Sequence, residues 1–247
     1  MMFGVFAPYG FALARVTGLL AGLPVLTVEV APVQVRGMVA IALTAGIGGT
    51  LPDTLELTAT GLAIEFLLGL AMGATVRVMG TALTVAGELI GVQMGIGFQQ
   101  LVDPRTQEMT GALSAVFNGV FGIMIFATGA YREMFRGLRA SFEVQPPNAV
   151  HGIGSVSYAV FEQASFAFGA GLRIGLPLVA VACASQLTFG FLTRVAPQLN
   201  VWALGFSVTI GFGMLALATY APALIQECAW LAREAVWTSF EVLEGRG

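Results

Sequence analysis

Residues 57–101, LTATGLAIEFLLGLAMGATVRVMGTALTVAGELIGVQMGIGFQQL, decide the fold of this chain. The stretch contains no proline, and its only charged side chains are Glu65, Arg77 and Glu88. A helix that crosses the hydrocarbon core of a bilayer needs about 20 apolar residues. The stretch is more than twice that length, so it predicts two membrane-type helices joined by a tight turn near residues 77–80.

The composition of the whole chain agrees with this segment. Of its 247 residues, 57% are hydrophobic and 10% are charged, and the mean hydropathy is +0.85. A soluble domain could not cover so apolar a chain with polar surface, so its helices must face lipid or other apolar protein. The net charge is −3 and the basic residues are all arginine, with no basic tract, which excludes nucleic-acid binding.

Three further apolar segments are separated by recognisable breaks. Residues 110–131 contain no charged side chain, and Asp103-Pro104 sets a turn before them. Residues 174–193 and 195–226 predict a second long hairpin, because Arg194 and the nearby Pro197 interrupt them. The fold class predicted from the sequence is therefore all-α, built from membrane-derived helical hairpins.

Arginines mark the ends of several of these segments. Arg132, Arg136 and Arg139 follow residues 110–131 at helical spacing, which places them on one face that must be solvated or paired. Between seven predicted spans, seven arginines fall on one side and two on the other. Arginine is enriched in cytoplasmic loops, so this count places the N-terminus outside and the C-terminus in the cytoplasm.

The C-terminal residues 227–247 show a different pattern. Trp230, Trp237 and Phe240 recur at roughly helical spacing against Glu227 and Glu234. This predicts an amphipathic helix that lies at a membrane surface. We treat it as part of a single domain that covers residues 1–247.

Five charged side chains lie inside apolar segments, where each costs roughly 2.5 to 3.5 kcal/mol to insert. They are Arg15, Glu65, Glu88, Glu162 and Arg173. One interpretation makes Glu65 and Glu88 a proton or ion relay. The other pairs them with arginines of this chain or of neighbouring subunits. No polar stripe accompanies the carboxylates, which favours the structural interpretation.

Glycine is abundant, with 32 residues, and several glycines are four residues apart. That spacing allows two helix backbones to approach closely. The pattern predicts extensive helix–helix contact, within or between subunits. The pairs that show it are Gly69 with Gly73, Gly91 with Gly95, and Gly171 with Gly175.

The sequence offers no basis for catalysis. It contains no HExxH motif and no phosphate-binding P-loop, and the single histidine, His151, has no cluster of metal ligands around it. Cys183 and Cys228 lie in or beside apolar runs without CxxC spacing, as small buried hydrophobes do. We expect no enzyme activity, no metal and no cofactor.

Three stretches together resemble a known family. Residues 87–98, GELIGVQMGIGF, run into Val102-Asp103-Pro104, and residues 194–200, RVAPQLN, are followed by Gly205-Phe206. These two motifs resemble the central and C-terminal signatures of the FliR family of flagellar export-gate proteins. The N-terminal pattern of that family is matched by Arg15, Gly18, Leu19, Pro24 and Arg36.

The resemblance covers nearly the whole chain and implies a function. It implies a non-enzymatic subunit of the flagellar type III export gate, which forms with FliP and FliQ, and in contact with FlhB, the channel for unfolded flagellar proteins. It places the chain in the bacterial inner membrane, in the flagellar basal body, with part of it above the bilayer plane on the periplasmic side. In such an assembly the helical hairpins wind together with partner subunits, whose protein groups can pair with charged side chains that lipid would leave unpaired.

The same resemblance implies a plug in the closed channel, and we assign a second set of residues to structure and assembly. A plug of the closed channel would have an apolar seal, a turn, and glutamines that hydrogen-bond across the lumen. The residues of this plug and gating loop are Phe98, Gln99, Gln100, Leu101, Val102, Asp103, Pro104 and Met109. The residues assigned to structure and assembly are Arg15, Arg36, Glu65, Glu88, Arg194, Pro197, Gln198, Asn200, Gly205 and Phe206.

Two alternatives stay open at this point. Injectisome members of the family resemble flagellar ones, although Gln93-Met94-Gly95 favours the flagellar branch. A different class of function is a secondary transporter with Glu65 and Glu88 as coupling carboxylates. A transporter would work alone, whereas a gate subunit would need its partners.

Overall fold

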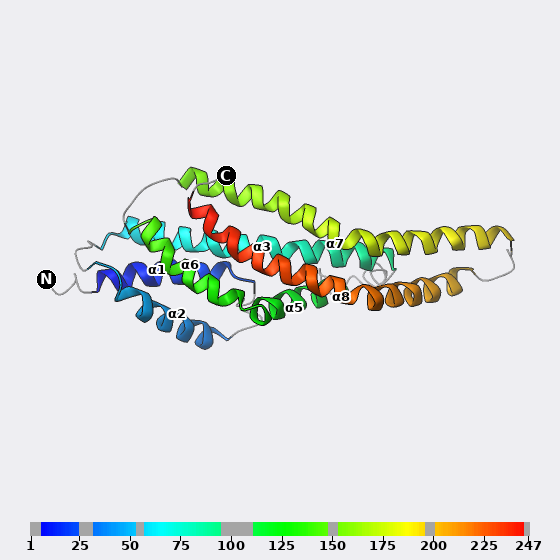
Figure 1. The fold of residues 1–247 in the computed structure, drawn as a ribbon, viewed down its shortest axis with the longest axis horizontal. Coiled ribbons are helices and arrows are strands. Elements are labelled where there is room, and N and C mark those ends of the chain that lie inside the picture. Colours follow the sequence, from blue (N-terminus) through cyan, green and yellow to red (C-terminus); the bar gives the residue numbers. More distant parts are fainter. Residues whose placement is uncertain are drawn as a thin grey trace. The chain divides into compact units, whose positions relative to one another are not determined.

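The computed structural model describes residues 6–24, 32–52, 57–94, 111–147, 153–195 and 201–244 (Figure 1). Within these ranges the chain forms seven helices and no strand. In chain order they are α1 (Ala7–Gly22), α2 (Val33–Gly48), α3 (Ala59–Gln93), α5 (Ala112–Ala127), α6 (Ala130–Val144), α7 (Ile153–Val195) and α8 (Val201–Glu244). The predicted all-α fold class is confirmed.

The chain divides into two compact units. The first unit comprises residues 1–80, 125–166 and 231–247, and the second comprises residues 81–124 and 167–230. Helices α3, α5, α7 and α8 contribute residues to both units. Each unit therefore draws on segments that are far apart in the sequence.

Helix α3 corrects the hairpin predicted for residues 57–101. It runs without a break for 35 residues, through the expected turn at residues 77–80. Arg77 is exposed on the helix surface, where its Nη2 donates to the carbonyl of Ala21 at 3.4 Å, and the neighbouring Val76 and Met79 are fully buried. With its charge accommodated at the surface and no proline present, nothing forces a turn. The membrane orientation was predicted from seven spans, two of which were counted within this one continuous helix, so that prediction rested on one span too many.

In the first unit, α1 and α3 pack through glycines. A Cβ atom at Gly22 would lie 2.6 Å from the carbonyl carbon of Gly73, and one at Gly18 would lie 2.8 Å from the backbone nitrogen of Leu70. Gly69 likewise faces the backbone of Arg15. Only glycine allows backbones to approach this closely. The close approach predicted for the pair Gly69 and Gly73 is therefore present, and it is a contact within the chain.

In the second unit, α7 approaches α3 closely at Gly171, where a Cβ atom would collide with the backbone of Ala82. At Gly175 a Cβ atom would lie 3.4 Å from the Cα of Ala86, which is an ordinary van der Waals distance. Helix α5 joins α3 through Ser114, whose hydroxyl donates to the carbonyl of Thr84 at 3.1 Å. The pair Gly171 and Gly175 thus also mediates contact within the chain. Gly95, from the third predicted pair, lies outside the described residues. Among the described residues, a Cβ atom at Gly91 would meet only the Cβ of Leu113, at 4.0 Å, so none of them makes a close backbone approach at Gly91.

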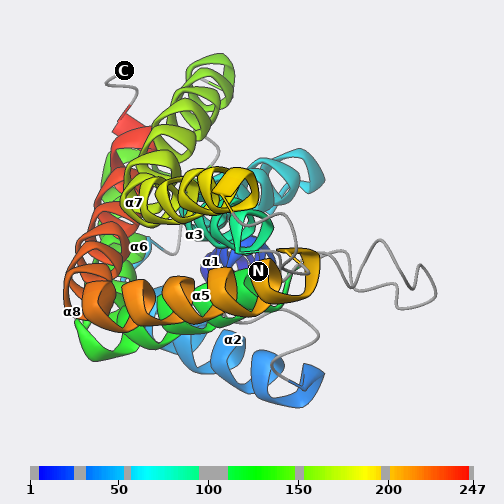
Figure 2. The ribbon, with the colours of Figure 1, turned by 90° about the vertical axis from the view of Figure 1, so that its right-hand side faces the viewer.

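The segment predicted as one span, residues 110–131, bends at its end. Helix α5 ends at Ala127, Gly129 adopts a left-handed conformation with φ 74°, and α6 departs at 69° to α5. The arginine face of α6, which is formed by Arg132, Arg136 and Arg139, is exposed, as the sequence predicts. Both views place α6 beside the last turns of α8, where the Phe240 ring occupies the space that a side chain at Gly137 would need (Figures 1 and 2).

Three segments of the described chain are long and apolar enough to cross a membrane, and the bent pair α5 and α6 would be a fourth. The three are Ala59–Gln93, Phe161–Thr188 and Val208–Phe240. The seven spans counted from the sequence are therefore too many for the residues that the structure describes.

The last two long helices separate where the sequence predicts. Helix α7 ends at Val195 and α8 begins at Val201, on either side of the break predicted at Arg194 and Pro197. Helix α8 continues without interruption to Glu244. Most of the predicted C-terminal amphipathic segment is therefore the end of α8 and not a helix that starts at residue 227.

Candidate functional site

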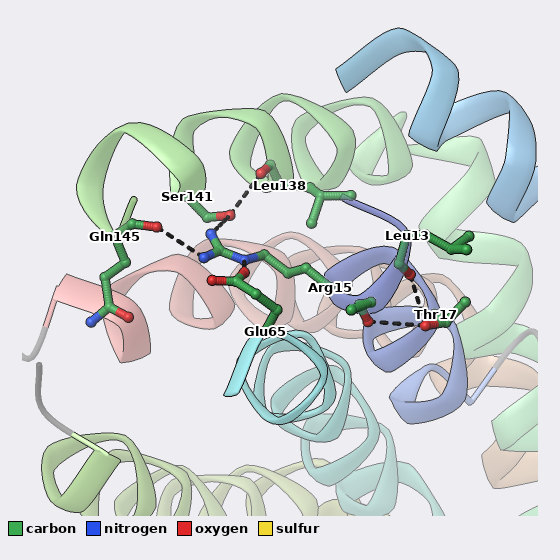
Figure 3. Close-up of polar contacts among 8 residues, drawn as sticks. Leu13, Arg15, Thr17, Glu65, Leu138, Ser141 and Gln145 are labelled. Atoms are coloured by element: carbon green, nitrogen blue, oxygen red, sulfur yellow. Dashed lines mark hydrogen bonds and ion pairs between the residues drawn. The ribbon is translucent and has the colours of Figure 1, made fainter. Parts of the chain in front are cut away.

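The most polar buried feature of the first unit surrounds Arg15 of α1. Its Nε donates to Glu65 Oε2 of α3 at 2.5 Å, and its Nη1 donates to Ser141 Oγ of α6 at 2.9 Å. Its Nη2 donates to the carbonyl oxygen of Gln145 at 2.9 Å. The guanidinium carbon lies 3.9 Å from the centroid of the Phe142 ring. We call these five residues the Arg15 cluster, of which Figure 3 labels Arg15, Glu65, Ser141 and Gln145.

Local helix chemistry positions each member of the cluster. Gly18 and Gly69 bring α1 and α3 so close that Arg15 reaches Glu65 directly. Gln145 is the C-cap residue of α6, and the carbonyls at a helix C-terminus lack partners within the helix. A guanidinium at this end satisfies such a carbonyl and complements the helix dipole. Arg15 therefore ties α1 to α3 by charge and to α6 by capping.

Burial makes this cluster energetically important. Arg15 is 0% exposed and Glu65 is 1% exposed. A charge removed from water is tolerated only when it is paired and hydrogen-bonded, and the loss of one partner typically costs about 3 to 5 kcal/mol. The Ser141 hydroxyl is itself oriented, since it donates to the carbonyl of Leu138 at 2.7 Å. The cluster is arranged to fix three helices together.

This geometry bears on the two interpretations of the buried carboxylates. Glu65 forms the ion pair with an arginine of the same chain that the structural interpretation predicts. Glu88 is exposed on α3, and within the described part of the chain no cation pairs with it. A carboxylate closed off by a buried guanidinium is poorly placed to exchange protons or ions with solvent. The arrangement favours a structural role for Glu65.

Other predicted assembly residues occupy varied positions. Arg36 is half-buried in the first turn of α2, and Arg194 is exposed in the last turn of α7. Gly205 and Phe206 lie in α8. The remaining predicted residues lie outside the described residues: Phe98, Gln99, Gln100, Leu101, Val102, Asp103, Pro104 and Met109 of the plug, and Pro197, Gln198 and Asn200.

The sequence analysis missed the α6 side of the Arg15 cluster. Ser141 and Phe142 share the buried face of α6 with Met134 and Leu138. The helical spacing of these residues was available in the sequence and predicts a buried face. No sequence signal, however, indicated that this face would meet Arg15, which lies 126 residues away from Ser141 in the chain.

Polar contacts in the second unit are more exposed. Arg173 Nη2 of α7 lies 3.5 Å from Glu227 Oε1 of α8, with 72% of the arginine side chain exposed. Gln186 Nε2 of α7 donates to the carbonyl oxygen of Gln93 at 2.9 Å, at the end of α3. Arg173, one of the five charges inside apolar segments, therefore has an acidic neighbour. Screening makes such an exposed pair weak.

The described residues contain no group of three or more His, Cys, Asp or Glu side chains that could hold a metal ion. Several of their polar side chains, including Arg15, Ser114 and Gln186, connect one helix to another. This arrangement is typical of a scaffold of packed helices.

Comparisons with known proteins agree with the sequence motifs. The family model described as bacterial export proteins, family 1, matches residues 6–235. The chain is 28% identical over 231 residues to the flagellar biosynthetic protein FliR of Escherichia coli K12, which covers 92% of this chain and 88% of that protein. It is 31% identical over 159 residues to FliR of Pectobacterium carotovorum, covering 64% of this chain and 60% of that one.

A third relative extends the match over most of the chain. FliR of Caulobacter vibrioides is 23% identical over 222 residues, which covers 86% of this chain and 88% of that protein. All three relatives bear the family name that the motifs predicted. Together with the three candidate spans, these matches identify a membrane-associated protein.

Proposed function

The chain belongs to the bacterial export proteins, family 1, and on this premise we propose that it is a non-enzymatic subunit of the flagellar type III protein export gate. In this proposal it assembles in the inner membrane with FliP and FliQ, contacts FlhB, and helps to form the channel through which unfolded flagellar proteins leave the cell. The observation that supports the proposal best is the family match across residues 6–235.

The exposed surface supports an assembled state. Large apolar side chains are exposed on several helices, including Met38 at 71% on α2, Phe161 at 71% on α7 and Leu215 at 61% on α8. An apolar surface of this extent must be covered by lipid or by other helices. Partner subunits supply such helices, and lipid covers whatever they leave free.

The transporter alternative receives less support. It needs Glu65 and Glu88 as coupling carboxylates, yet Glu65 is closed off by Arg15 and Glu88 is exposed. The relatives that match the chain are named as flagellar biosynthetic proteins. We therefore retain the gate subunit as the proposal.

The decisive experiment expresses the tagged full chain with and without candidate FliP and FliQ proteins, purifies it in mild detergent and determines its mass. A stable complex several times heavier than 25.7 kDa that forms only with the partners is the expected result. A well-behaved chain that purifies alone or as a homodimer, with no complex when the partners are present, would refute the proposal. That outcome would instead favour a secondary transporter.

Within the gate, we assign residues 98–104 and Met109 to the plug of the resting channel. Deletion of residues 100–106 is expected to leave the assembled complex intact, because Asp103-Pro104 predicts a turn there and the deleted residues lie outside α3 and α5. The deletion is expected to make the resting channel leaky to ions, which planar-bilayer conductance measures. Wild-type conductance in an assembled deletion variant would contradict this assignment.

We assign Arg194, Pro197, Gln198 and Asn200 to the bend between α7 and α8. Proline removes a helix donor, and nearby polar side chains can satisfy the carbonyls that it exposes. Asn200→Ala is expected to lower the amount of assembled gate. A variant that assembles normally but blocks export would instead indicate direct contact with the exported chain.

A further inference from the structure

The elbow between α5 and α6, at residues 128 and 129, separates two contrasting surfaces. Helix α5 has no charged residue, whereas α6 has five within 15 residues. Aromatic rings gather at the elbow: the Phe126 and Tyr131 centroids are 5.7 Å apart, and those of Tyr131 and Phe135 are 6.2 Å apart. Tyrosine is enriched where a helix passes from the hydrocarbon core to the headgroups of a bilayer.

The arginine face of α6 begins directly after this aromatic group. Arg132 is exposed, and its Nε lies 3.1 Å from the Tyr131 hydroxyl oxygen. Arg136 is exposed and pairs with Glu133, with Nη1 2.6 Å from Oε1. Arg139 is exposed, and no carboxylate pairs with it among the described residues. Among the described residues, Arg132 and Arg139 therefore have no carboxylate partner, so their exposed guanidinium groups can bind an anion from outside the chain.

The opposite face of α6 is already occupied. Met134, Leu138 and Phe142 are buried in the first unit, and Gly137 meets the Phe240 ring. The helix therefore cannot insert its apolar side into a membrane as a free amphipathic helix would. Outward it presents three guanidinium groups next to an aromatic anchor, together with Glu133, which pairs with Arg136, and the exposed Glu143.

From these observations we propose that the arginine face of α6 binds the phosphate groups of anionic phospholipids at the membrane surface. Guanidinium groups form short, charge-assisted hydrogen bonds with phosphate oxygens. The aromatic rings at the elbow set the depth, so that charge-free α5 faces the hydrocarbon side and Arg132 and Arg139 face the headgroups. The inference concerns lipid recognition by α6 and does not depend on the export function.

The test titrates the full chain in neutral detergent micelles with phosphatidylglycerol or with zwitterionic phosphatidylcholine and counts bound lipid by native mass spectrometry. The double variant R132Q/R139Q leaves the pair between Arg136 and Glu133 intact. Each arginine near an anionic surface changes affinity about fivefold, so this variant is expected to bind phosphatidylglycerol about 25-fold more weakly. Its binding of phosphatidylcholine is expected to be unchanged.

Two matched variants separate charge from folding. R132K/R139K keeps both charges and is expected to retain most of the affinity, whereas E133Q frees Arg136 and is expected to bind phosphatidylglycerol several-fold more tightly. If R132Q/R139Q loses its helical circular dichroism, the phosphatidylglycerol affinities of R132K/R139K and E133Q test the proposal in its place. Equal uptake of the two lipids by the wild-type chain, unchanged binding by R132Q/R139Q, or weaker binding by E133Q would each overturn the proposal.

Discussion

Replacing Arg15 by methionine strands a carboxylate that is 1% exposed. Glu65 loses its ion pair, and the carbonyl of Gln145 loses its donor. Removal of one partner from a buried ion pair costs about 3 to 5 kcal/mol. Replacing Glu65 by methionine strands the guanidinium instead, and we expect a loss of similar size.

The double variant R15M/E65M distinguishes this reasoning from a simple loss of contacts. It removes both charges, and the half-buried Gln145 carbonyl loses its bond from Arg15, whereas Ser141 still donates to Leu138. Loss of one such hydrogen bond costs about 0.5 to 1.5 kcal/mol. The double variant is therefore expected to be more stable than either single variant.

The free energy of unfolding is measured on the full chain in neutral detergent micelles, by titration with sodium dodecyl sulfate and far-ultraviolet circular dichroism. Arg139→Met serves as the control, because this exposed arginine of α6 should change stability by less than about 0.5 kcal/mol. If the double variant loses as much free energy of unfolding as the two single variants together, the view that Arg15 and Glu65 neutralise each other is refuted.

Three glycines give further predictions, each measured by the same unfolding assay. Gly22→Ala places a Cβ atom 2.6 Å from the backbone of α3, so it is expected to separate α1 from α3 and to lower the free energy of unfolding. Gly46→Ala is the control: a Cβ atom there meets nothing within 4 Å, so this change should be neutral or stabilising. Gly129→Ala meets no neighbour but must adopt φ 74°, so it should cost about 1 to 2 kcal/mol; a smaller cost would show that the elbow relaxes. The new methyl group of Gly137→Ala collides with the Phe240 ring and should lower the free energy of unfolding. Adding Phe240→Leu to the same chain should restore part of that loss, and no recovery would show that the collision lies elsewhere.

The sequence predicted features that depend on local chemistry. The charge-free runs and the break at Arg194 and Pro197 correspond to helices α5, α7 and α8, because apolar length and proline act within a few residues. Close backbone approach was likewise predicted correctly at Gly69, Gly73 and Gly171, since a missing side chain has the same steric effect wherever its helix packs.

The failures concern how an apolar chain accommodates charge. A turn was expected near Arg77 because residues 57–101 are more than twice as long as one span, but the structure exposes this arginine on the surface of a continuous α3. Arg15 was expected to need a partner, yet the sequence did not specify which elements would supply it. The answer depends on tertiary packing, which brings Ser141 and Gln145 of α6 to α1.

A buried ion pair is seldom the most stable choice, because hydrophobic residues of similar size often serve as well. Here the ion pair sets the register of α1 along α3. Glycine-lined helix faces are smooth, so α1 could slide by a turn along α3 and still pack, whereas the bond from Arg15 to Glu65 forms in one register alone. Spin labels at the exposed positions Leu13 and Leu67 should give one distance in an otherwise cysteine-free chain and several in R15M/E65M. A single unchanged distance in that variant would show that glycine packing alone sets the register.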